Sequence, residues 1–416
     1  MALAQYTILH SDLNSFYASV EMMLNPTLRH KAVAVCGSTE ERHGIVLAKS
    51  ELAKRAGVKT GMVTWAAKRL CPELITVPPQ IEQYVKYSEL TRTIYERYSD
   101  LVEPFGMDEC WIDVTASRRT CGDGYQIAED IRKTVCEELG LTVSIGVSFS
   151  KVFAKLGSDI KKPDAVTCIT AENYKDMVWP LPASDLLGVG RATGPKLQER
   201  GIYTIGDVAK CDPDLMRSYL GINGVRLWAY ANGEDHASIS PYGYEPPVKS
   251  IGHGITANAD LVNEKEVQQI LYELAQAVAK QLRQTHLIAT RIQLFVRDTN
   301  LSYREFQGKL EYPTQSWREM VDTAMALFRK RYTWQNPVRS ITIRAINLIH
   351  IDTPIQLDLF GDHAKRKRMD ALEVTIEGLQ ERFGRDAVVL GSSMHGLKMQ
   401  KDRSHELLTM PSVMYT

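Results

Sequence analysis

Two short strand-like stretches carry acidic side chains at one end, although they lie far apart in the chain. Residues 6–9 have the pattern of a short strand, and Asp12 follows them directly. Residues 107–114 alternate as a strand does, with Asp108 and Glu109 near the start. Neighbouring strands of one sheet lie only about 5 Å apart, so such strand ends can meet. The pattern predicts an α/β unit in which three carboxylates converge.

The rest of the sequence divides into regions of different character. Strand and helix patterns continue through residues 1–170, whereas residues 180–233 contain short helices separated by glycines. Residues 238–247 are rich in Pro, Gly and Ser, as interdomain linkers are. A chain of 416 residues is about three times an ordinary domain of roughly 150 residues, so several domains are expected.

The region after this linker predicts a second α/β domain. Residues 267–282 repeat apolar side chains at helical spacing, and residues 291–297 and 340–348 alternate as strands. The helix between these strands should begin with a capping box, in which Ser316 and Glu319 bond the first backbone N–H groups.

Composition excludes several classes of protein. No apolar stretch reaches the roughly 18 residues of a membrane span, and no secretory signal is visible, so a cytoplasmic protein is expected. The 7 cysteines form no C-x-x-C pair, which argues against a zinc site or a disulfide framework. With 50 basic and 50 acidic residues, any attraction to nucleic acid must come from local patches.

Three converging carboxylates have a chemical use. Hard oxygen ligands suit Mg²⁺, which binds carboxylates together with substrate phosphates and water. Two such ions can activate an attacking hydroxyl and neutralise charge on a transferring phosphoryl group. From spacing alone, the plainer interpretation is that acidic residues at strand ends are turn formers or helix caps.

The surrounding motifs decide between these interpretations. Residues 10–21, HSDLNSFYASVE, and residues 105–114, FGMDECWIDV, resemble the Y family, the translesion DNA polymerases, and the resemblance runs through nearly the whole chain. It implies that two Mg²⁺ ions are held by the catalytic carboxylates and by one backbone carbonyl. The residues concerned are Asp12, Asp108, Glu109 and, through its carbonyl, Leu13.

The resemblance also implies an α+β multidomain fold of the right-hand polymerase type. The expected regions are a palm of mixed sheet and helices (1–20 and 75–170), small fingers (21–74), a helical thumb with helix-hairpin-helix motifs (171–236), a linker (237–247), an α/β little finger (248–350) and a tail (351–416).

Three positions depart from patterns that are common in this family. Asn14 stands where many members have a second aspartate, and Gly106 where many have serine; neither change removes an expected metal carboxylate. Asp-x-Asn looks more like the polymerase V group and its Gram-positive relatives than the polymerase IV group, so the subgroup stays open. Glu51 replaces a tyrosine of the fingers. Because a carboxylate would repel a triphosphate, we expect Glu51 to point away, or a neighbour to replace the tyrosine.

Four residues match the family's nucleotide pocket. Tyr17, five residues after Asp12, matches the steric gate that fills the space of a ribose 2′-hydroxyl, and Phe16 packs beside it. Lys162 matches the lysine that contacts the incoming triphosphate, and Lys54 matches a fingers position that is arginine or lysine. Without the resemblance, the aromatics would be ordinary core residues and the lysines ordinary surface residues.

Glycine hairpins in the thumb region predict contacts with DNA phosphates. Gly188 and Gly190 in LLGVG precede a predicted helix, where backbone N–H groups can approach a phosphate. Residues 220–224, LGING, give a looser second copy, as in the family's thumb. A single Gly-x-Gly is usually only a tight turn.

The second α/β domain resembles the little finger, which grips duplex DNA. Arg291 and Arg297 lie on the polar face of one strand, Arg344 on that of another, and Lys249 stands at the start of the domain. These four residues are predicted to bind the phosphate backbone. The plainer interpretation is a half-exposed sheet, which always has a polar face.

The segment after this domain resembles the motif by which bacterial polymerases bind the sliding clamp. Its residues are Gln356, Leu357, Leu359 and Phe360 in QLDLF. The expected partners are primer-template DNA, deoxynucleoside triphosphates and the clamp (β subunit), with no membrane, and the protein is expected to be a monomer.

Two other functions stay open. The first is a DNA- and clamp-binding protein with impaired catalysis, which Glu51 and Asn14 favour. The second is another two-metal nucleotidyl enzyme on a palm-like sheet, such as a cyclase. That enzyme would need neither the glycine hairpin nor the QLDLF segment.

Overall fold

The computed structural model describes residues 6–39, 42, 44–235, 237–356, 361–394 and 396–399. These residues form two compact units. Among the described residues, the first unit runs to Gly37 and continues over Ile45–Pro246, and the second takes in Ser38–Gly44 and residues 247–399. None of the helices in these ranges combines the length and the apolar character that crossing a lipid bilayer requires.

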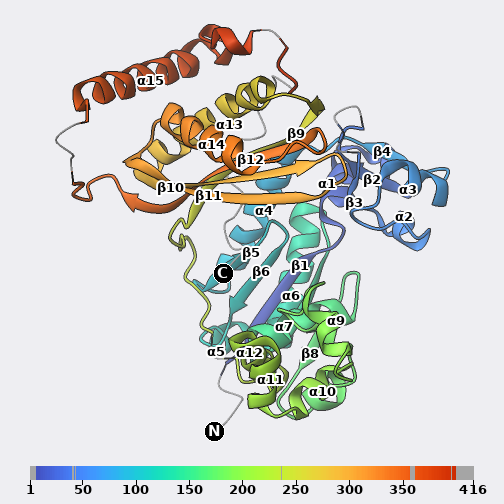
Figure 1. The fold of residues 1–416 in the computed structure, drawn as a ribbon. Helices are drawn as coiled ribbons and strands as arrows, with labels where there is room; N and C mark the ends of the chain where they lie inside the picture. Colours follow the sequence, from blue (N-terminus) through green and yellow to red (C-terminus); the bar gives the residue numbers. More distant parts are fainter. Residues whose placement is uncertain are drawn as a thin grey trace. The chain divides into compact units, whose positions relative to one another are not determined.

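A five-stranded sheet with the order β5-β6-β1-β7-β8 forms the centre of the first unit (Figure 1). β7 and β8 are parallel, and the other neighbours are antiparallel. The strands are β1 (Ile8–Leu13), β5 (Val102–Phe105), β6 (Glu109–Asp113), β7 (Val143–Ser148) and β8 (Val166–Ile169). The helices around them are α1 (Phe16–Leu24), α4 (Ile81–Glu96), α5 (Arg118–Cys121), α6 (Gly124–Leu139) and α7 (Lys151–Ile160).

Side chains of β1 alternate between two helical layers. Leu9 belongs to the core that the sheet shares with α4 and α6, whereas Ile8 packs with Ala154 of α7. By the same alternation Asp12 lies on the α7 side. The α7 helix crosses β7 so closely that a Cβ atom on Gly146 would lie 1.9 Å from the carbonyl oxygen of Ala154. A glycine at this position therefore lets α7 lie directly over the centre of the sheet.

A three-stranded sheet with the order β3-β2-β4 lies in the region expected for the fingers. Its elements are β2 (Val33–Cys36), β3 (Val46–Lys49), α2 (Glu51–Arg55), α3 (Thr64–Leu70) and β4 (Ile75–Val77). β4 pairs in parallel with β2, so this small sheet extends beyond residue 74.

Short helices follow β8, as the glycine-rich sequence predicts. They are α8 (Tyr174–Val178), α9 (Thr193–Gln198), α10 (Ile205–Lys210), α11 (Pro213–Leu220) and α12 (Ile222–Ala231). Their core includes Phe149 and Phe153, so these helices pack on the N-terminal end of α7.

Part of the expected linker lies along the large sheet. Ile239 is buried against Trp111, and the backbone N–H of Ser240 donates a hydrogen bond to Glu103 at 2.8 Å. The N–H of Tyr242 donates to a backbone carbonyl beside β5 at 2.9 Å. The chain is thus held to the first unit until about residue 242.

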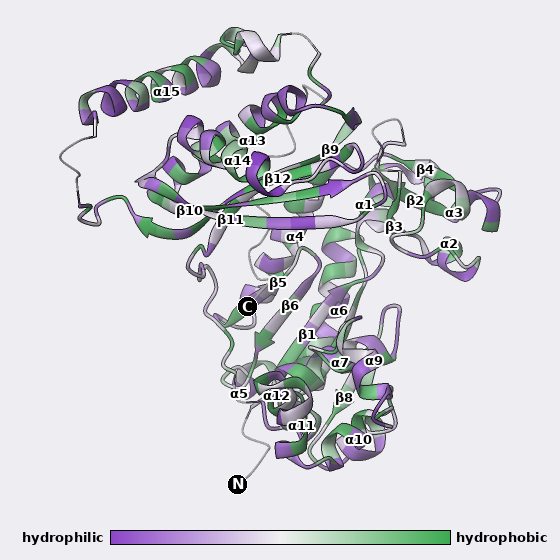
Figure 2. Cartoon of the chain, viewed as in Figure 1, coloured by the Kyte–Doolittle hydropathy of each residue, from purple (hydrophilic) through white to green (hydrophobic). Residues whose placement is uncertain are grey.

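The second unit contains an antiparallel sheet with the order β11-β10-β12-β9, packed against α13 and α14. Its elements are β9 (Ser250–Leu261), α13 (Glu264–Gln284), β10 (Leu287–Asp298), β11 (Tyr303–Thr314), α14 (Trp317–Arg331) and β12 (Val338–His350). Hydrophilic and apolar residues alternate along the strands (Figure 2). Ile292, Leu294 and Val296 point into the core, which confirms the predicted apolar face of β10.

The tail after residue 361 folds onto this unit as α15 (His363–Phe383). The predicted capping box of α14 is wrong. The Ser316 hydroxyl donates to the carboxylate of Glu373 in α15 at 2.7 Å, and the N–H of Trp317 donates to the same carboxylate at 3.2 Å. Glu319 instead forms an ion pair with Arg366 of α15. In a capping box the hydroxyl of Ser316 would accept the N–H of Glu319, but here it donates to a buried carboxylate of a distant helix, and the N–H of Ser316 donates to the hydroxyl of Thr314 at 2.9 Å.

Candidate active site

Asp12 and Glu109 are direct partners in the pairing of β1 with β6. Directly paired residues of antiparallel strands point to the same face, so both carboxylates lie on the α7 side. Asp108 stands in the turn before β6, and its backbone carbonyl accepts a hydrogen bond from the N–H of Leu13 at 2.9 Å. The prediction that the strand ends before Asp12 is wrong, because β1 continues through Leu13. Asp12 and Glu109 thus share one face of the sheet, and Asp108 is near enough for their charges to raise its pKa.

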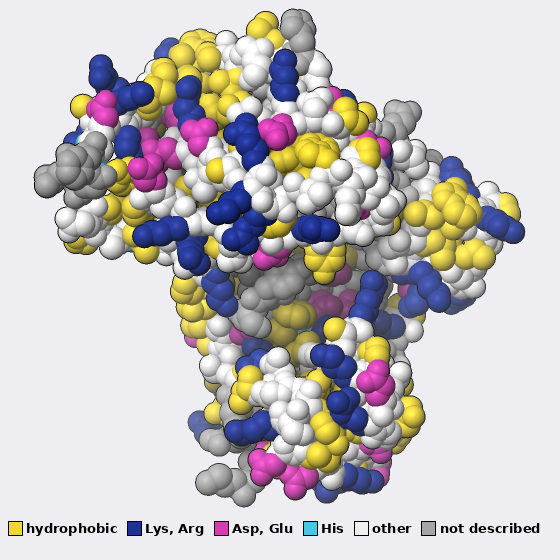
Figure 3. Space-filling view, viewed as in Figure 1, with side chains coloured by type: hydrophobic (Ala, Val, Ile, Leu, Met, Phe, Trp, Pro, Cys, Tyr) yellow, Lys and Arg dark blue, Asp and Glu magenta, His cyan; other side chains and the backbone are white. Residues whose placement is uncertain are grey.

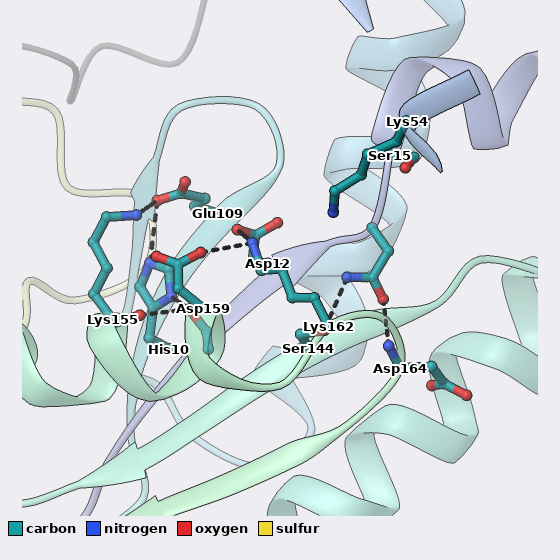
Figure 4. A network of polar contacts seen from close by, with 12 residues as sticks. His10, Asp12, Ser15, Lys54, Glu109, Ser144, Lys155, Asp159, Lys162 and Asp164 are labelled. Atoms are coloured by element: carbon teal, nitrogen blue, oxygen red, sulfur yellow. Dashed lines mark hydrogen bonds and ion pairs between the residues drawn. The ribbon is translucent and has the colours of Figure 1, made fainter. Parts of the chain in front are cut away.

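Lysines from α7 and the following loop contact these carboxylates (Figure 4). Nζ of Lys162 lies 2.6 Å from Oδ2 of Asp12 and 2.8 Å from Oδ1 of Asp159. Lys155 forms an ion pair with Glu109. The sequence interpretation missed Lys155 and Asp159. Their spacing of four and then three residues up to Lys162 is the signal that would have placed them on one helix face.

His10 is a second residue that the sequence interpretation missed. Its side chain is completely buried, and Nδ1 lies 2.9 Å from the hydroxyl of Ser158. Nε2 lies 3.2 Å from Oε2 of Glu109, outside good hydrogen-bond geometry. Burial lowers the pKa of His10, so the ring is neutral at neutral pH. The alternation of β1 was the available signal, because residues 10 and 12 share a face.

Burial and neighbouring charges shift the pKa values of the three carboxylates in different directions. Burial, followed by the charges of Asp12 and Glu109, raises the pKa of Asp108 to about 6. Burial also raises the pKa of Asp12, although Lys162 opposes this effect. For Glu109 burial has the same sign, but His10 and Lys155 outweigh it and lower the pKa to about 2. The cluster therefore holds more negative charge than its surroundings stabilise.

The carboxylate oxygens of this cluster are donors of the kind that a hard divalent cation binds. In the described part of the chain, no set of three or more His, Cys, Asp or Glu side chains has its donors arranged around one metal-sized point. Lys162 and Lys155 contact Asp12 and Glu109 in this structure. Carboxylate oxygens at a site with excess negative charge are the ligands that Mg²⁺ prefers.

Tyr17 lies beside this cluster, whereas Phe16 belongs to the core. The ring of Tyr17 stacks on Tyr84 with centroids 4.2 Å apart and planes 8° from parallel. Its hydroxyl lies 3.3 Å from Sδ of Met107, the residue before Asp108. Only 3% of Phe16 is exposed. Of the two aromatics, Tyr17 alone flanks the carboxylates.

Glu51 contacts Ser15 and Lys54. Its carboxylate accepts a hydrogen bond from the hydroxyl of Ser15 at 3.1 Å, just after the end of β1. Nζ of Lys54 lies 3.7 Å from the same carboxylate, and Lys54 extends from α2 toward the carboxylate cluster (Figure 4). The repulsion expected between the Glu51 carboxylate and a triphosphate is offset, because Glu51 forms an ion pair with Lys54.

Comparison with known proteins decides the family. Residues 11–159 match the impB/mucB/samB family, and residues 248–359 match the C-terminal domain of that family. A DNA polymerase IV of Acetivibrio thermocellus is 45% identical over 377 residues, which cover 91% of this chain and 94% of that protein. DNA polymerase IV 1 of Bacillus subtilis is 36% identical, and the match covers 93% of each chain. This chain belongs to the Y family of DNA polymerases.

The structure agrees with Y-family membership. A solved chain, a Y-family DNA polymerase chimera of Dbh and Dpo4, matches with a TM-score of 0.74 at 23% identity, covering 83% of this chain and 99% of that one. The expected polymerase fold is thereby confirmed. The chain is a DNA-directed DNA polymerase of the translesion type, so the cyclase alternative is wrong. Its relatives carry the name DNA polymerase IV, which answers the open subgroup question in favour of that group.

The region expected to form the thumb has its two glycine hairpins before helices. Gly188 has a φ of +94°, a conformation that other residues rarely adopt. The carbonyl of Gly190 accepts hydrogen bonds from the N–H groups of Thr193 and Gly194 at the start of α9. In the second hairpin, Gly221 with φ +65° joins α11 to α12.

In the second unit, the four cations predicted to bind DNA lie outside the core. Arg291 and Arg344 are exposed, and their strands are neighbours in the sheet. Arg297 is half-buried, and Lys249 is exposed just before β9. Lys and Arg side chains gather over β10 and β11 on the face that Figure 3 shows. In QLDLF, Gln356 is described, whereas Leu357, Leu359 and Phe360 lie outside the described residues.

Proposed function

We propose that this Y-family polymerase transfers a nucleotide to a primer through a two-Mg²⁺ site held by Asp12, Asp108, Glu109 and the carbonyl of Leu13. The direct pairing of Asp12 with Glu109, beside the Asp108 turn, is the observation that carries this proposal. Bound Mg²⁺ would lower the pKa of the primer 3′-hydroxyl and neutralise charge on the transferring phosphoryl group. The carboxylates would position that hydroxyl for in-line attack on the α-phosphate of a deoxynucleoside triphosphate, so that the new O–P bond forms as the bond to the leaving pyrophosphate breaks.

Lys162 is proposed to bind the triphosphate. A lysine between two carboxylates keeps its charge, and the pKa of Lys162 is indeed raised by Asp12 and Asp159, although burial acts in the other direction. The oxygens of a triphosphate are charge-assisted acceptors as a carboxylate is, and they carry more negative charge in total, so Lys162 would move from Asp12 to the nucleotide. Lys54, which is half-exposed beside Glu51, would provide a second cation from the fingers.

Tyr17 is proposed to exclude ribonucleotides. Its ring is held from one side by Tyr84, whose hydroxyl donates to Glu21 at 2.5 Å. Glu21 also accepts a hydrogen bond from Gln80 at 2.7 Å, which fixes the carboxylate. A ring supported in this way cannot move aside without cost, so a ribose 2′-hydroxyl would clash with it. Phe16 would support the same helix from the core.

Contacts with DNA and the clamp complete the proposal. The hairpins at Gly188 and Gly190 would present backbone N–H groups to phosphates, and Lys249, Arg291, Arg297 and Arg344 would bind the backbone of the duplex. Gln356, Leu357, Leu359 and Phe360 would bind a bacterial sliding clamp, because the motif follows directly after the last strand of the sheet. The protein would act as a cytoplasmic monomer.

Primer extension tests this function. Wild type should extend a recessed primer on a template with Mg²⁺ and deoxynucleotides, and neither Asp108→Ala nor Glu109→Ala should do so. Each variant should show the same circular dichroism and melting behaviour as a folded protein. No extension by folded wild type, even with clamp added, would favour the DNA- and clamp-binding protein with impaired catalysis.

A further inference from the structure

We propose that Asn14 is a positioning residue for nucleotide binding, because its side-chain amide ties the loop that carries Lys162 to the strand that carries Asp12. The proposal rests on the proposed role of Lys162. It assigns a use to the position where this chain departs from the Asp-x-Asp pattern of many family members.

The amide of Asn14 is buried and uses both of its ends. Only 6% of Asn14 is exposed. Oδ1 accepts a hydrogen bond from the backbone N–H of Asp164 at 2.8 Å, and Nδ2 donates to the hydroxyl of Ser144 in β7 at 2.9 Å. Since a backbone N–H can only donate, the bond to Asp164 fixes which end of the amide is oxygen. Both contacts are marked at Ser144 and Asp164 in Figure 4.

The residue that Asn14 holds lies two positions after Lys162. Asp164 has a φ of +55°, which is uncommon for a residue other than glycine, so the loop needs support in this conformation. Arg132 of α6 donates to the Asp164 carboxylate at 2.8 Å from the other side. The backbone N–H and the side chain of one loop residue are thus held by two different elements.

Asn14 therefore sets the distance between two functional groups. Asn14 follows Asp12 by two residues. Its backbone N–H donates to the carbonyl of Thr142 at 2.9 Å, and this bond fixes its position. The loop placed by Asn14 brings Nζ of Lys162 to 2.6 Å from Asp12. Without the bond to Asp164, the lysine would still be present, but its loop would sample other positions.

The same geometry explains why Asn and Asp can both occupy this position. A carboxylate at residue 14 would accept the N–H of Asp164 as the amide oxygen does. The hydroxyl of Ser144 can rotate and donate to the second oxygen. An alanine can do neither. Position 14 is thus a loop anchor, and asparagine there removes no metal ligand.

Steady-state kinetics with a single deoxynucleotide test this proposal. We expect Asn14→Ala to raise KM for the nucleotide about tenfold, the size of the loss of one buried hydrogen bond, with a smaller change in kcat. Asn14→Asp should stay within about twofold of wild type, because it keeps both bonds. Lys162→Ala should raise KM by about tenfold or more, and the double variant with Asn14→Ala should be no worse than Lys162→Ala alone.

Two further variants separate positioning from general damage. Asn173→Ala is a matched control, because Oδ1 of Asn173 also accepts a backbone N–H, that of Thr170 at 2.7 Å, and its loss should leave KM unchanged. Ser144→Ala removes only one of the two contacts of Asn14 and should raise KM less than Asn14→Ala. If Asn14→Ala fails to fold, Ser144→Ala and Asn14→Asp carry the test.

Hydrogen exchange gives a reading that does not depend on activity. The amide of Asp164 should exchange faster in Asn14→Ala than in wild type and remain protected in Asn14→Asp. If Lys162→Ala raises KM while Asn14→Ala changes neither KM nor this exchange, the positioning role is wrong and the proposed function stands. If Lys162→Ala leaves KM unchanged, the proposed role of Lys162 fails instead.

Discussion

Buried carboxylates occur in both units, and their partners differ in kind. Glu373 in α15 accepts hydrogen bonds from the hydroxyl of Ser316 and the N–H of Trp317, at the N-terminus of α14. The negative charge of Asp12 raises the pKa of Asp108, which lies near it. The close partner of Asp12 is the ammonium group of Lys162, which stands at the end of a flexible side chain. Two fixed hydrogen-bond donors, with Nε of Arg318 3.7 Å from the same carboxylate, make Glu373 part of the fold. Like charges balanced by movable cations leave Asp12 and Asp108 available for chemistry.

The largest effect that this comparison predicts is on catalysis. Asp108→Asn removes a charge from the crowded site and should lower the extension rate by at least about 10³-fold, as expected when a metal ligand that stabilises the transition state is lost. Its free energy of unfolding should equal or exceed that of wild type, because repulsion with Asp12 is relieved. Single-turnover extension and urea unfolding check the two statements. If Asp108→Asn were active or clearly destabilised, Asp108 would not be a carboxylate that serves catalysis at the expense of stability.

Divalent cations should stabilise the first unit by relieving the same repulsion. Saturating Mg²⁺ should raise the free energy of unfolding of wild type by about 1–3 kcal/mol, since the ion binds the folded state alone. Asp108→Asn should gain much less. Thermal melting with Mg²⁺ and with EDTA measures this difference. Equal gains in the two proteins would show that the ion binds elsewhere.

Glu373→Ala should lower the free energy of unfolding and leave the extension rate unchanged, the opposite of what is expected for Asp108→Asn. It leaves the hydroxyl of Ser316 and the N–H of Trp317 without their buried acceptor, at a cost of about 2 kcal/mol. Extension of a short primer below the melting temperature should keep its wild-type rate. The matched control is Glu381→Ala, which removes an exposed α15 carboxylate that lies 2.7 Å from Lys280 and should leave stability unchanged.

The pH dependence of stability gives the smallest and most specific effect. The pKa of Asp108 is raised from 3.8 to about 6, so between about pH 4 and 6 the folded state keeps a proton that the unfolded state has lost. The free energy of unfolding of metal-free wild type should therefore fall as the pH rises through this window, by about 1 kcal/mol or more relative to Asp108→Asn. Urea unfolding at several pH values measures the slope, and parallel curves for the two proteins would refute the assignment.

Glu109 should act in a separate window with the opposite sign. Its pKa is lowered to about 2, so it contributes stability that is present above about pH 4.5 and is lost as the pH falls toward 2. Comparing wild type with Glu109→Gln below pH 4 separates this contribution from that of Asp108.

Much of the fold and the family could be predicted from the sequence. Alternation and helical spacing correctly indicated α13, β10 and β12, because burial of one face imposes periods of 2 and 3.6 residues on the sequence itself. The motifs around Asp12 and Asp108 likewise identified the Y family before the fold was known. These are local features, and a chain carries them without reference to its partners.

Only the tertiary structure decided which polar groups meet. Ser316 had the pattern of a capping box, yet its hydroxyl bonds Glu373, which is 57 residues away. Asn14 looked like a weakened metal motif, yet it anchors Asp164, 150 residues later. Hydrogen bonds and ion pairs depend on distances of about 3 Å between side chains, and such distances follow from how the layers pack. Sequence periodicity determines which face of an element a residue occupies, but the packing of the elements determines which hydrogen-bond and ion-pair partners it has there.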